Sequence, residues 1–196
     1  MGYALSILFG YLLGSIPFGL VLCKIFGLGD IRTIGSGNIG ATNVLRTGNK
    51  PLALATLLLD SGKGAIAVII MGLLFNFDAA MLAGFFALIG HCYPVWLKFK
   101  GGKGVATTLG TLIALAPILG LITCGIWAIT AALSRISSLS ALVAVGFSPL
   151  IAHYLYDNSN LSGLCAAIAA LVYIKHRENI KRLFAGQEPR VGKSKK

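Results

Sequence analysis

The stretch VATTLGTLIALAPILGLITCGIWAITAAL, from Val105 to Leu133, decides how many helices of this chain cross a membrane. A hydrocarbon core of about 30 Å needs about 20 helical residues, so the stretch is too long for one plain span and short for two. Pro117 and Gly120 lie near its middle, where they favour a break or a bend. The charges in the rest of the chain must therefore decide the number of spans.

A bilayer is the natural solvent for most of this chain. Of its 196 residues, 56% are hydrophobic and only 12% are charged, whereas a soluble domain carries roughly a quarter charged residues. The first apolar segment has no basic start and no small-x-small cleavage site, so we expect a retained span rather than a signal peptide. The seven apolar segments are Tyr3 to Ile25, Leu52 to Phe75, Ala79 to Leu97, Val105 to Ile118, Leu121 to Leu133, Leu139 to Tyr156 and Leu161 to Ile174.

The basic residues favour seven spans over six. With seven spans and the N-terminus outside, every basic loop and the tail after Ile174 fall inside, as the positive-inside rule requires. With six spans, either the first three basic loops or the tail would face outward. We therefore predict an all-α, polytopic transmembrane bundle with an outer N-terminus and a cytoplasmic C-terminus. Its predicted parts are a transmembrane domain over residues 1–183 and a basic tail over 184–196 that frays or lies on the membrane surface.

The excess of cations is a membrane feature here. The formal net charge is +11, from 17 Lys and Arg against 6 Asp and Glu. These cations lie in short connections between apolar runs, which argues against nucleic-acid binding and favours anionic lipid or substrate. The four cysteines form no C-x-x-C pair, so we expect neither a disulfide framework nor a metal site. They are Cys23, Cys92, Cys124 and Cys165.

Two glycine-rich loops have the composition of anion-binding sites. The first, Gly35 to Asn43, reads GSGNIGATN and precedes Arg46, which could fold back as a planar phosphate ligand. Ser36 or Asn38 is a possible cap for a short helix after it. The second, Lys98 to Gly104, reads KFKGGKG and runs directly into an apolar helix. It lacks the P-loop spacing, so it indicates phosphate binding but no nucleotidase.

A third polar segment follows the last apolar run. It reads HRENI, from His176 to Ile180, and places His176 and Asn179 on one helix face. Histidine serves in proton transfer and also as a phosphate donor, although at a helix end it is more often structural.

Other polar residues lie within or beside the apolar segments. Asp60 and Lys63 stand three residues apart, so they can form an ion pair inside the membrane. Ser138 and Ser140 either face a cytoplasmic cavity or serve the helix end. His91 and His153 have no partner that the sequence indicates.

The three motifs together closely resemble the bacterial acyl-phosphate-dependent glycerol-3-phosphate acyltransferases. The likeness covers essentially the whole chain, in the length, in the order of the motifs and in the phrase from Asp60 to Gly64. It implies transfer of a fatty acyl group from acyl phosphate to the 1-hydroxyl of glycerol 3-phosphate. The implied products are lysophosphatidic acid and inorganic phosphate, in the first step of phospholipid synthesis at the bacterial inner membrane, with the active site facing the cytoplasm.

The resemblance also carries over site residues by position. Within the second motif, it associates Lys103 and the glycines with glycerol 3-phosphate. The predicted catalytic residues are Ser36, Lys103, His176 and Asn179. The predicted substrate-binding residues are Asn38, Gly40, Thr42, Asn43, Arg46, Lys98, Gly101, Gly102, Gly104, Ser138 and Ser140.

The sequence also indicates which acyl donor to expect. Acyltransferases that use acyl-CoA or an acyl carrier deprotonate the hydroxyl with an H-x-x-x-x-D pair, and neither His91 nor His153 begins one. Acyl phosphate is already activated, so less help is needed. Either His176 accepts the hydroxyl proton, or the substrate's phosphate does so while His176 positions it. We expect no cofactor, no metal and no acyl-cysteine intermediate, and we expect the protein to be a monomer in contact with membrane lipid.

Two other function classes compete with an acyltransferase. A transporter for a phosphorylated anion predicts polar groups through the membrane midplane and two pseudo-symmetric halves, and the sequence shows neither apart from Asp60 and Lys63. A scaffold with a basic face leaves the three motifs unexplained.

Overall fold

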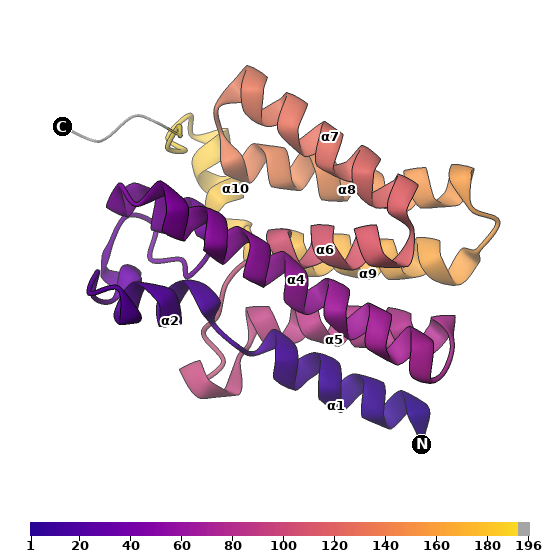
Figure 1. The fold of residues 1–196 in the computed structure, drawn as a ribbon. Coiled ribbons are helices and arrows are strands. Elements are labelled where there is room, and N and C mark those ends of the chain that lie inside the picture. Colours follow the sequence, from indigo (N-terminus) through magenta and orange to yellow (C-terminus); the bar gives the residue numbers. More distant parts are fainter. Residues whose placement is uncertain (192–196) are drawn as a thin grey trace. The chain divides into compact units, whose positions relative to one another are not determined.

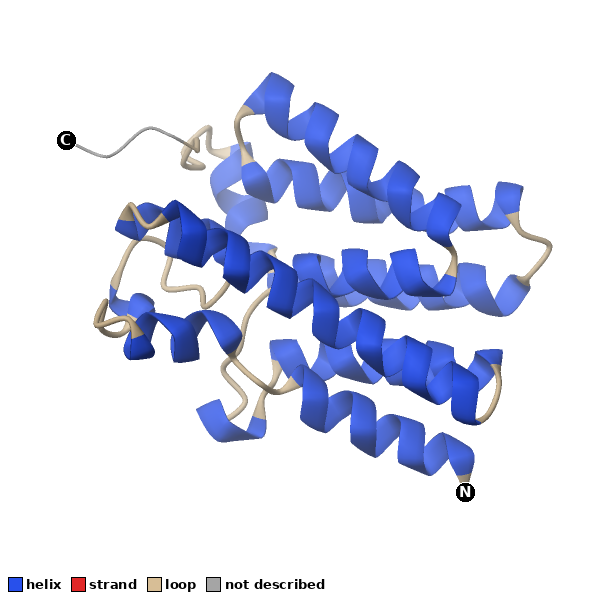
Figure 2. Cartoon of the chain, viewed as in Figure 1, coloured by secondary structure: helices blue, strands red, loops and turns tan. Residues whose placement is uncertain are grey.

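The computed structural model describes residues 1–191, and within that range it contains helices, turns and loops but no strand (Figure 2). The chain divides into two compact units. Unit 1 is Met1–Pro117, and unit 2 is Ile118–Lys196, of which the structure describes residues up to Val191. The predicted all-α class is therefore confirmed for the described residues.

Unit 1 is built on a long central helix, α4 (Lys50–Leu74). It packs against α5 (Phe77–Cys92) and α6 (Val105–Leu115), and α1 (Gly2–Gly14) packs along α5 (Figure 1). Two short helices, α2 (Phe18–Ile25) and α3 (Ala41–Val44), lie against α4. Three single 3-10 turns complete the unit: Ile31–Thr33, Leu45–Thr47 and Val95–Leu97.

Helix α4 has the residue distribution of a membrane helix. Its inward face carries small and polar residues, and its outward face carries large apolar ones. In a bilayer large apolar side chains gain nothing by leaving lipid, whereas small residues let helices approach closely. The buried positions include Ala53, Thr56, Asp60, Lys63, Gly64, Ala67 and Met71, and the exposed ones include Leu54, Leu58, Ile69 and Leu73.

Close packing of α1 on α5 depends on glycine. A Cβ atom added at Gly14 would lie 2.1 Å from the carbonyl oxygen of Ala87, and one added at Gly10 would lie 2.3 Å from that of Ala83. Real Cβ atoms do not approach a backbone oxygen so closely. The two glycines therefore allow backbone-to-backbone contact between these helices, as in other membrane helix pairs.

Unit 2 contains α7 (Pro117–Ser134) from its second residue onward, together with α8 (Ser137–Leu155), α9 (Ser159–Lys175) and α10 (Arg177–Phe184). Helix α8 packs on α9, and the hydroxyl of Tyr173 donates to the carbonyl of Leu142 across that contact at 3.0 Å. After α10 the chain turns back, and the amide of Val191 donates to the carbonyl of Arg135 at 2.7 Å. Of the two predictions for the tail, fraying is wrong for residues 184–191, because hydrogen bonds hold this part to the start of α8, and a place on the membrane surface stays a prediction.

The helices coincide with the seven predicted apolar segments, except that the first segment is divided into two helices. Five segments are long and apolar enough to cross a membrane: Gly2–Ile25, Lys50–Leu74, Phe77–Leu97, Pro117–Ser134 and Ser137–Leu155. Two apolar helices are shorter, Val105–Leu115 and Ser159–Lys175. The predicted break near Pro117 is confirmed, since α6 ends at Leu115 and α7 begins at Pro117.

The first segment is not the single helix that the sequence predicted. It divides into α1 and α2 at Ser15-Ile16-Pro17, because proline supplies no amide hydrogen and disfavours helical backbone in the residue before it. Whether the protein has seven spans, and which terminus faces which side, remain predictions.

Candidate functional site

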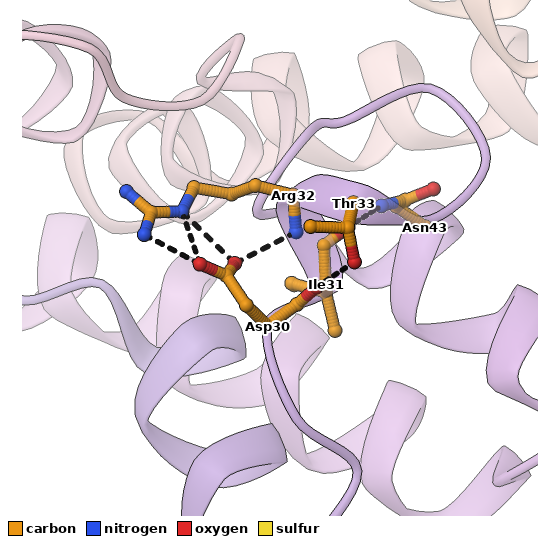
Figure 3. A network of polar contacts seen from close by, with 5 residues as sticks. All are labelled: Asp30, Ile31, Arg32, Thr33 and Asn43. Atoms are coloured by element: carbon orange, nitrogen blue, oxygen red, sulfur yellow. Dashed lines mark hydrogen bonds and ion pairs between the residues drawn. The ribbon is translucent and has the colours of Figure 1, made fainter.

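The glycine-rich loop of unit 1 is organised by a buried side chain, Asn43. Its amide nitrogen donates to the carbonyl of Ile31 at 2.8 Å (Figure 3). It also donates to the carbonyl of Ile34 at 3.0 Å. Its amide oxygen accepts from the backbone and hydroxyl of Ser36, at 3.1 Å and 3.4 Å, and from Arg46 Nη1 at 3.3 Å. Asn43 therefore shapes the loop from inside, and a direct contact between it and substrate stays a prediction.

Arg46 folds back against the tip of this loop, as the sequence predicted. A Cβ atom added at Gly35 would lie 2.5 Å from Asn43 Oδ1 and 2.7 Å from Arg46 Nη1, and the φ of Gly35 is +58°. Only glycine tolerates both that backbone conformation and that proximity. Ser36 and Arg46 are exposed and share one acceptor, so the loop presents a hydroxyl and a guanidinium side by side.

Arg46 is the cation at this loop tip because Arg32 is occupied elsewhere. Arg32 Nε lies 2.9 Å from Asp30 Oδ1 (Figure 3). The side-chain hydrogen bond from Arg32, followed by the one from its backbone amide, lowers the pKa of Asp30 to about 2. The two charges neutralise each other at ordinary pH.

The remaining residues of the first motif surround the start of α3. Gly40 is the N-cap of that helix and offers no side chain, so the prediction that Ser36 or Asn38 caps it is wrong. Asn38, Gly40 and Thr42 are half-buried. Their contact with substrate stays a prediction.

The second loop is fastened to the C-terminal end of α5. The amide of Gly101 donates to the carbonyl of Cys92 at 3.2 Å, and that of Gly102 donates to the carbonyl of His91 at 3.0 Å. Lys98 and Phe99 have positive φ values of 51° and 61°, a conformation that non-glycine residues rarely adopt. Lys98 is exposed in this turn.

Lys103 stands between two buried glycines where the loop enters α6. Gly104 is the N-cap of that helix, with φ of +81°, and a Cβ atom there would lie 2.0 Å from Leu88 Cδ1. Helix N-termini attract anions through their unpaired amides and dipole. A half-buried lysine at this position adds a full charge to that field.

The two loops of unit 1 share one apolar base. Ile31, Ile39 and Val44, which underlie the first loop, form a buried cluster with Cys23, and Leu97 packs against this cluster one residue before Lys98. The first and second predicted motifs are therefore brought together.

In unit 2 the third motif lies at the junction of α9 and α10. His176 is buried, and its Nδ1 lies 2.8 Å from the carbonyl oxygen of Val172. A carbonyl oxygen can only accept, so Nδ1 carries a proton, and in the neutral ring the lone pair is on Nε2. The ring is thereby held in the tautomer that accepts a proton at Nε2.

Glu188 is a functional candidate that the sequence did not predict. Its Oε1 accepts from Ser138 Oγ and from Asn179 Nδ2, both at 2.6 Å, and its Oε2 accepts from Arg182 Nε at 2.7 Å. Burial pushes the pKa of Glu188 upward, but the hydrogen bonds from Ser138, Asn179 and Arg182 outweigh it and hold the pKa below its ordinary value. Its signal in the sequence was a lone acid in a basic tail.

Glu188 also separates the two candidate serines. Ser138 shares the Glu188 oxygen with Asn179, whereas Ser140 is fully buried and its hydroxyl donates to the carbonyl of Ile136 at 2.9 Å within its own helix. The arrangement favours Ser138 as the serine next to the third motif.

Two predictions concerned the interior of unit 1. The pairing of Asp60 with Lys63 is confirmed, with a distance of 3.0 Å between Oδ1 and Nζ. The sequence indicated no partner for His91, and the structure supplies one, since its Nδ1 lies 2.8 Å from Lys63 Nζ. Within residues 1–191 no group of three His, Cys, Asp or Glu residues could hold a metal ion.

Comparison with known proteins gives one consistent family. Residues 4–186 match the family described as glycerol-3-phosphate acyltransferase. The chain is 60% identical to the glycerol-3-phosphate acyltransferase of Jannaschia sp. (strain CCS1), covering 97% of this chain and 93% of that protein. It is 58% identical to that of Paramagnetospirillum magneticum, covering 95% and 92%.

Two solved structures agree with this family. The chain is similar to the crystal structure of PlsY, an integral membrane glycerol 3-phosphate acyltransferase, in its glycerol 3-phosphate form, with a TM-score of 0.93 and 38% identity, covering 98% of this chain and 96% of the other. For the lysophosphatidic acid form the TM-score is 0.90, at the same 38% identity, covering 97% and 95%. The predicted family is confirmed, and this chain is an integral membrane member of the glycerol-3-phosphate acyltransferase family.

Proposed function

We propose that this enzyme transfers a fatty acyl group from acyl phosphate to the 1-hydroxyl of glycerol 3-phosphate. The products are lysophosphatidic acid and inorganic phosphate. The reaction is the first step of phospholipid synthesis and takes place on the cytoplasmic side of the bacterial inner membrane. One observation carries the proposal: two cationic, glycine-rich loops, with Arg46 and Lys103, stand on one apolar base in unit 1.

Two phosphate-bearing substrates call for two anion sites. Glycerol 3-phosphate and acyl phosphate each carry a phosphate, whereas an acyl thioester presents a neutral reacting group. Ser36 with Arg46 supplies a hydroxyl and a planar guanidinium, and Lys103 supplies an ammonium at a helix start. PlsY, at 38% identity, has been solved in a glycerol 3-phosphate form and in a lysophosphatidic acid form, which supports the same substrate and product here.

The proposed reaction is a single acyl transfer. The oxygen of the 1-hydroxyl attacks the acyl carbonyl carbon, the bond between that carbon and the bridging phosphate oxygen breaks, and phosphate leaves with the bonding electron pair. The hydroxyl proton passes to the departing phosphate or to His176. Cations and backbone amides stabilise the oxyanion that develops on the carbonyl oxygen, and one such donor is typically worth about 3 kcal/mol.

Within unit 2, His176 and Asn179 fit a polar role beside the reacting groups. Because Nδ1 donates to Val172, Nε2 is the acceptor nitrogen of the neutral His176 ring, and such a nitrogen suits a contact with the substrate hydroxyl. Asn179 and Ser138 are oriented by Glu188. We propose Ser36, Lys103, His176 and Asn179 as catalytic residues and the other motif residues as substrate-binding ones.

The donor is tested with purified protein in detergent. With palmitoyl phosphate and glycerol 3-phosphate we expect phosphate release and lysophosphatidic acid formation in equal amounts. With palmitoyl-CoA in place of palmitoyl phosphate we expect no product above background, because the sequence contains no H-x-x-x-x-D pair. Comparable turnover of the two donors would contradict the proposed donor and leave the family assignment intact.

A further inference from the structure

A buried polar triad lies beneath the second loop. It consists of Asp60 and Lys63 on α4 and His91 at the end of α5, and each of their side chains is at most 4% exposed. Lys63 Nζ lies 3.0 Å from Asp60 Oδ1, 2.8 Å from His91 Nδ1 and 3.0 Å from the carbonyl oxygen of Ile16. The contact with Asp60 is an ion pair without hydrogen-bond geometry, so Lys63 is held by two hydrogen-bonding partners and one countercharge.

The triad fixes the state of the His91 ring. Because Nδ1 faces the ammonium of Lys63 and accepts from it, the proton of the neutral ring is on Nε2. Asp60 Oδ1 lies 3.6 Å from the same Nδ1. Both the orientation of the ring and its tautomer are therefore determined by charges inside the helix bundle.

The other edge of the ring contacts Gly102. A Cβ atom added at Gly102 would lie 2.1 Å from His91 Nε2 and 2.9 Å from Cδ2 and Cε1. Gly102 does not have a positive φ, and the three atoms nearest to an added Cβ all belong to the His91 ring, so the ring is what excludes a side chain. The amide of Gly102 also donates to the carbonyl of His91. His91 thus holds the loop by its ring and by its backbone, next to Lys103.

Bundle stability alone does not account for such a triad. A buried ion pair often stabilises a protein no better than apolar side chains of similar volume, because both charges must be stripped of water. An ammonium fixed by two hydrogen-bonding partners and a countercharge does, however, specify one geometry.

We propose that Asp60, Lys63 and His91 are positioning residues for the reaction. They hold the turn Gly101-Gly102 in place so that Lys103 meets the phosphate of glycerol 3-phosphate. The inference rests on the proposed function of this loop. The triad acts through Gly102 and not by touching substrate.

A double-mutant cycle between His91 and Gly102 tests the contact. His91→Asn keeps an acceptor for Lys63 but removes the ring atoms Nε2 and Cε1, which gives a side chain at position 102 room. We expect Gly102→Ala alone to raise the KM for glycerol 3-phosphate about tenfold, and the same change in the His91→Asn background to raise it less than about twofold. We expect His91→Asn alone to raise this KM about fivefold with little change in kcat.

An equal factor for Gly102→Ala in both backgrounds would overturn the proposal, as would a wild-type KM in His91→Asn. His153→Asn is the matched control, since His153 is exposed on α8, and it should leave KM and kcat unchanged. The Kd for glycerol 3-phosphate, measured by calorimetry, should follow the same cycle. If the wild type binds glycerol 3-phosphate but releases no phosphate from palmitoyl phosphate, the proposed donor is wrong, whereas the Kd cycle still decides the positioning role.

A charge-free variant covers the case in which Gly102→Ala does not fold. Asp60→Asn combined with Lys63→Met leaves no unpaired charge in the interior, so it should melt near the wild-type temperature. We expect its KM for glycerol 3-phosphate to rise about fivefold while its kcat stays within about threefold. A folded variant with wild-type KM and Kd would show that the triad serves packing only and would overturn the proposal. Asp78→Asn, at an exposed acid on α5, is the control.

Discussion

Asn179 Nδ2 lies 2.6 Å from Glu188 Oε1, and this bond makes the chain after α10 part of the candidate site in unit 2. The same oxygen accepts from Ser138, so one carboxylate orients two polar side chains from two helices. Arg182 binds the other oxygen and balances the charge. A segment that is polar and basic in sequence is thereby held in one conformation.

We expect Glu188→Gln to lower the thermal stability of the protein in detergent. The hydrogen bonds from Ser138 and Asn179 survive in part, but the charge that attracts Arg182 is lost, at a cost of about 1.5 kcal/mol. Because folding lowers the pKa of Glu188, its stabilisation is fully present above the unfolded pKa of about 4.3 and is lost as pH falls through the folded value.

Melting temperatures between pH 7 and pH 3 check this prediction. Wild-type stability should fall more steeply below about pH 4.3 than that of Glu188→Gln, since the variant has no proton to take up at this site. The control is Glu178→Gln, at an exposed acid whose ion pairs with Arg177 and Lys181 are also exposed. Equal acid sensitivity of the wild type and Glu188→Gln would contradict the role of Glu188.

We expect Arg46→Gln to raise the KM for glycerol 3-phosphate about 30-fold, as the loss of a charge-assisted contact with phosphate should. If that contact tightens in the transition state, kcat falls as well. The matched control is Arg32→Gln in the same loop region, because Arg32 is paired with Asp30. Similar kinetic losses in the two variants would mean that general loop charge, and not the Arg46 contact, is what binds phosphate.

The sequence predicted the structural features that depend on residues close together in the chain. The apolar segments, the break at Pro117 and the return of Arg46 to Gly35 follow from local composition and chain stiffness, and the structure confirms them. The break at Pro17 was missed although proline gives its signal, because the surrounding residues are apolar enough to read as one span.

The sequence could not predict contacts between residues that are far apart in the chain. Ser138 and Glu188 are 50 positions apart, and Lys63 and His91 are 28 apart. Which side chains meet at such separations depends on how helices rotate and slide against each other, and a single sequence carries no periodic signal for it. The predicted site was therefore a set of motifs, and the residues that orient them, Glu188 and His91, emerged only with the fold.

The predicted topology can be checked by cysteine accessibility in intact cells, in a Cys124→Ala background that keeps the three buried cysteines. Cysteines at Lys50 and Lys100 should be shielded from an impermeant reagent, and cysteines at Asp78 and Asp157 should react. All four positions are exposed in the structure, so access reports the side of the membrane. Gly102 is unsuitable because His91 excludes a side chain there. Labelling of Lys50 and Asp78 positions from the same side would disprove the seven-span prediction.

The pH dependence of two His176 variants distinguishes a general base from a group that only positions the substrate. Because Nδ1 donates to Val172, Nε2 is the atom that we propose for the contact with substrate in either case. If His176 is the general base, His176→Ala should lower kcat about 10²–10⁴-fold and remove one ionisation from the pH profile. As a positioning group, His176 should be replaceable in part by Gln, whose terminal amide reaches the place of Nε2, and the shape of the pH profile should be retained.

We expect the second outcome, since acyl phosphate is already activated and its phosphate can take the proton. Rates of phosphate release for wild type, His176→Ala and His176→Gln between pH 5 and pH 9 decide it. A His176→Gln protein that folds and binds glycerol 3-phosphate normally but shows no turnover would establish His176 as the base.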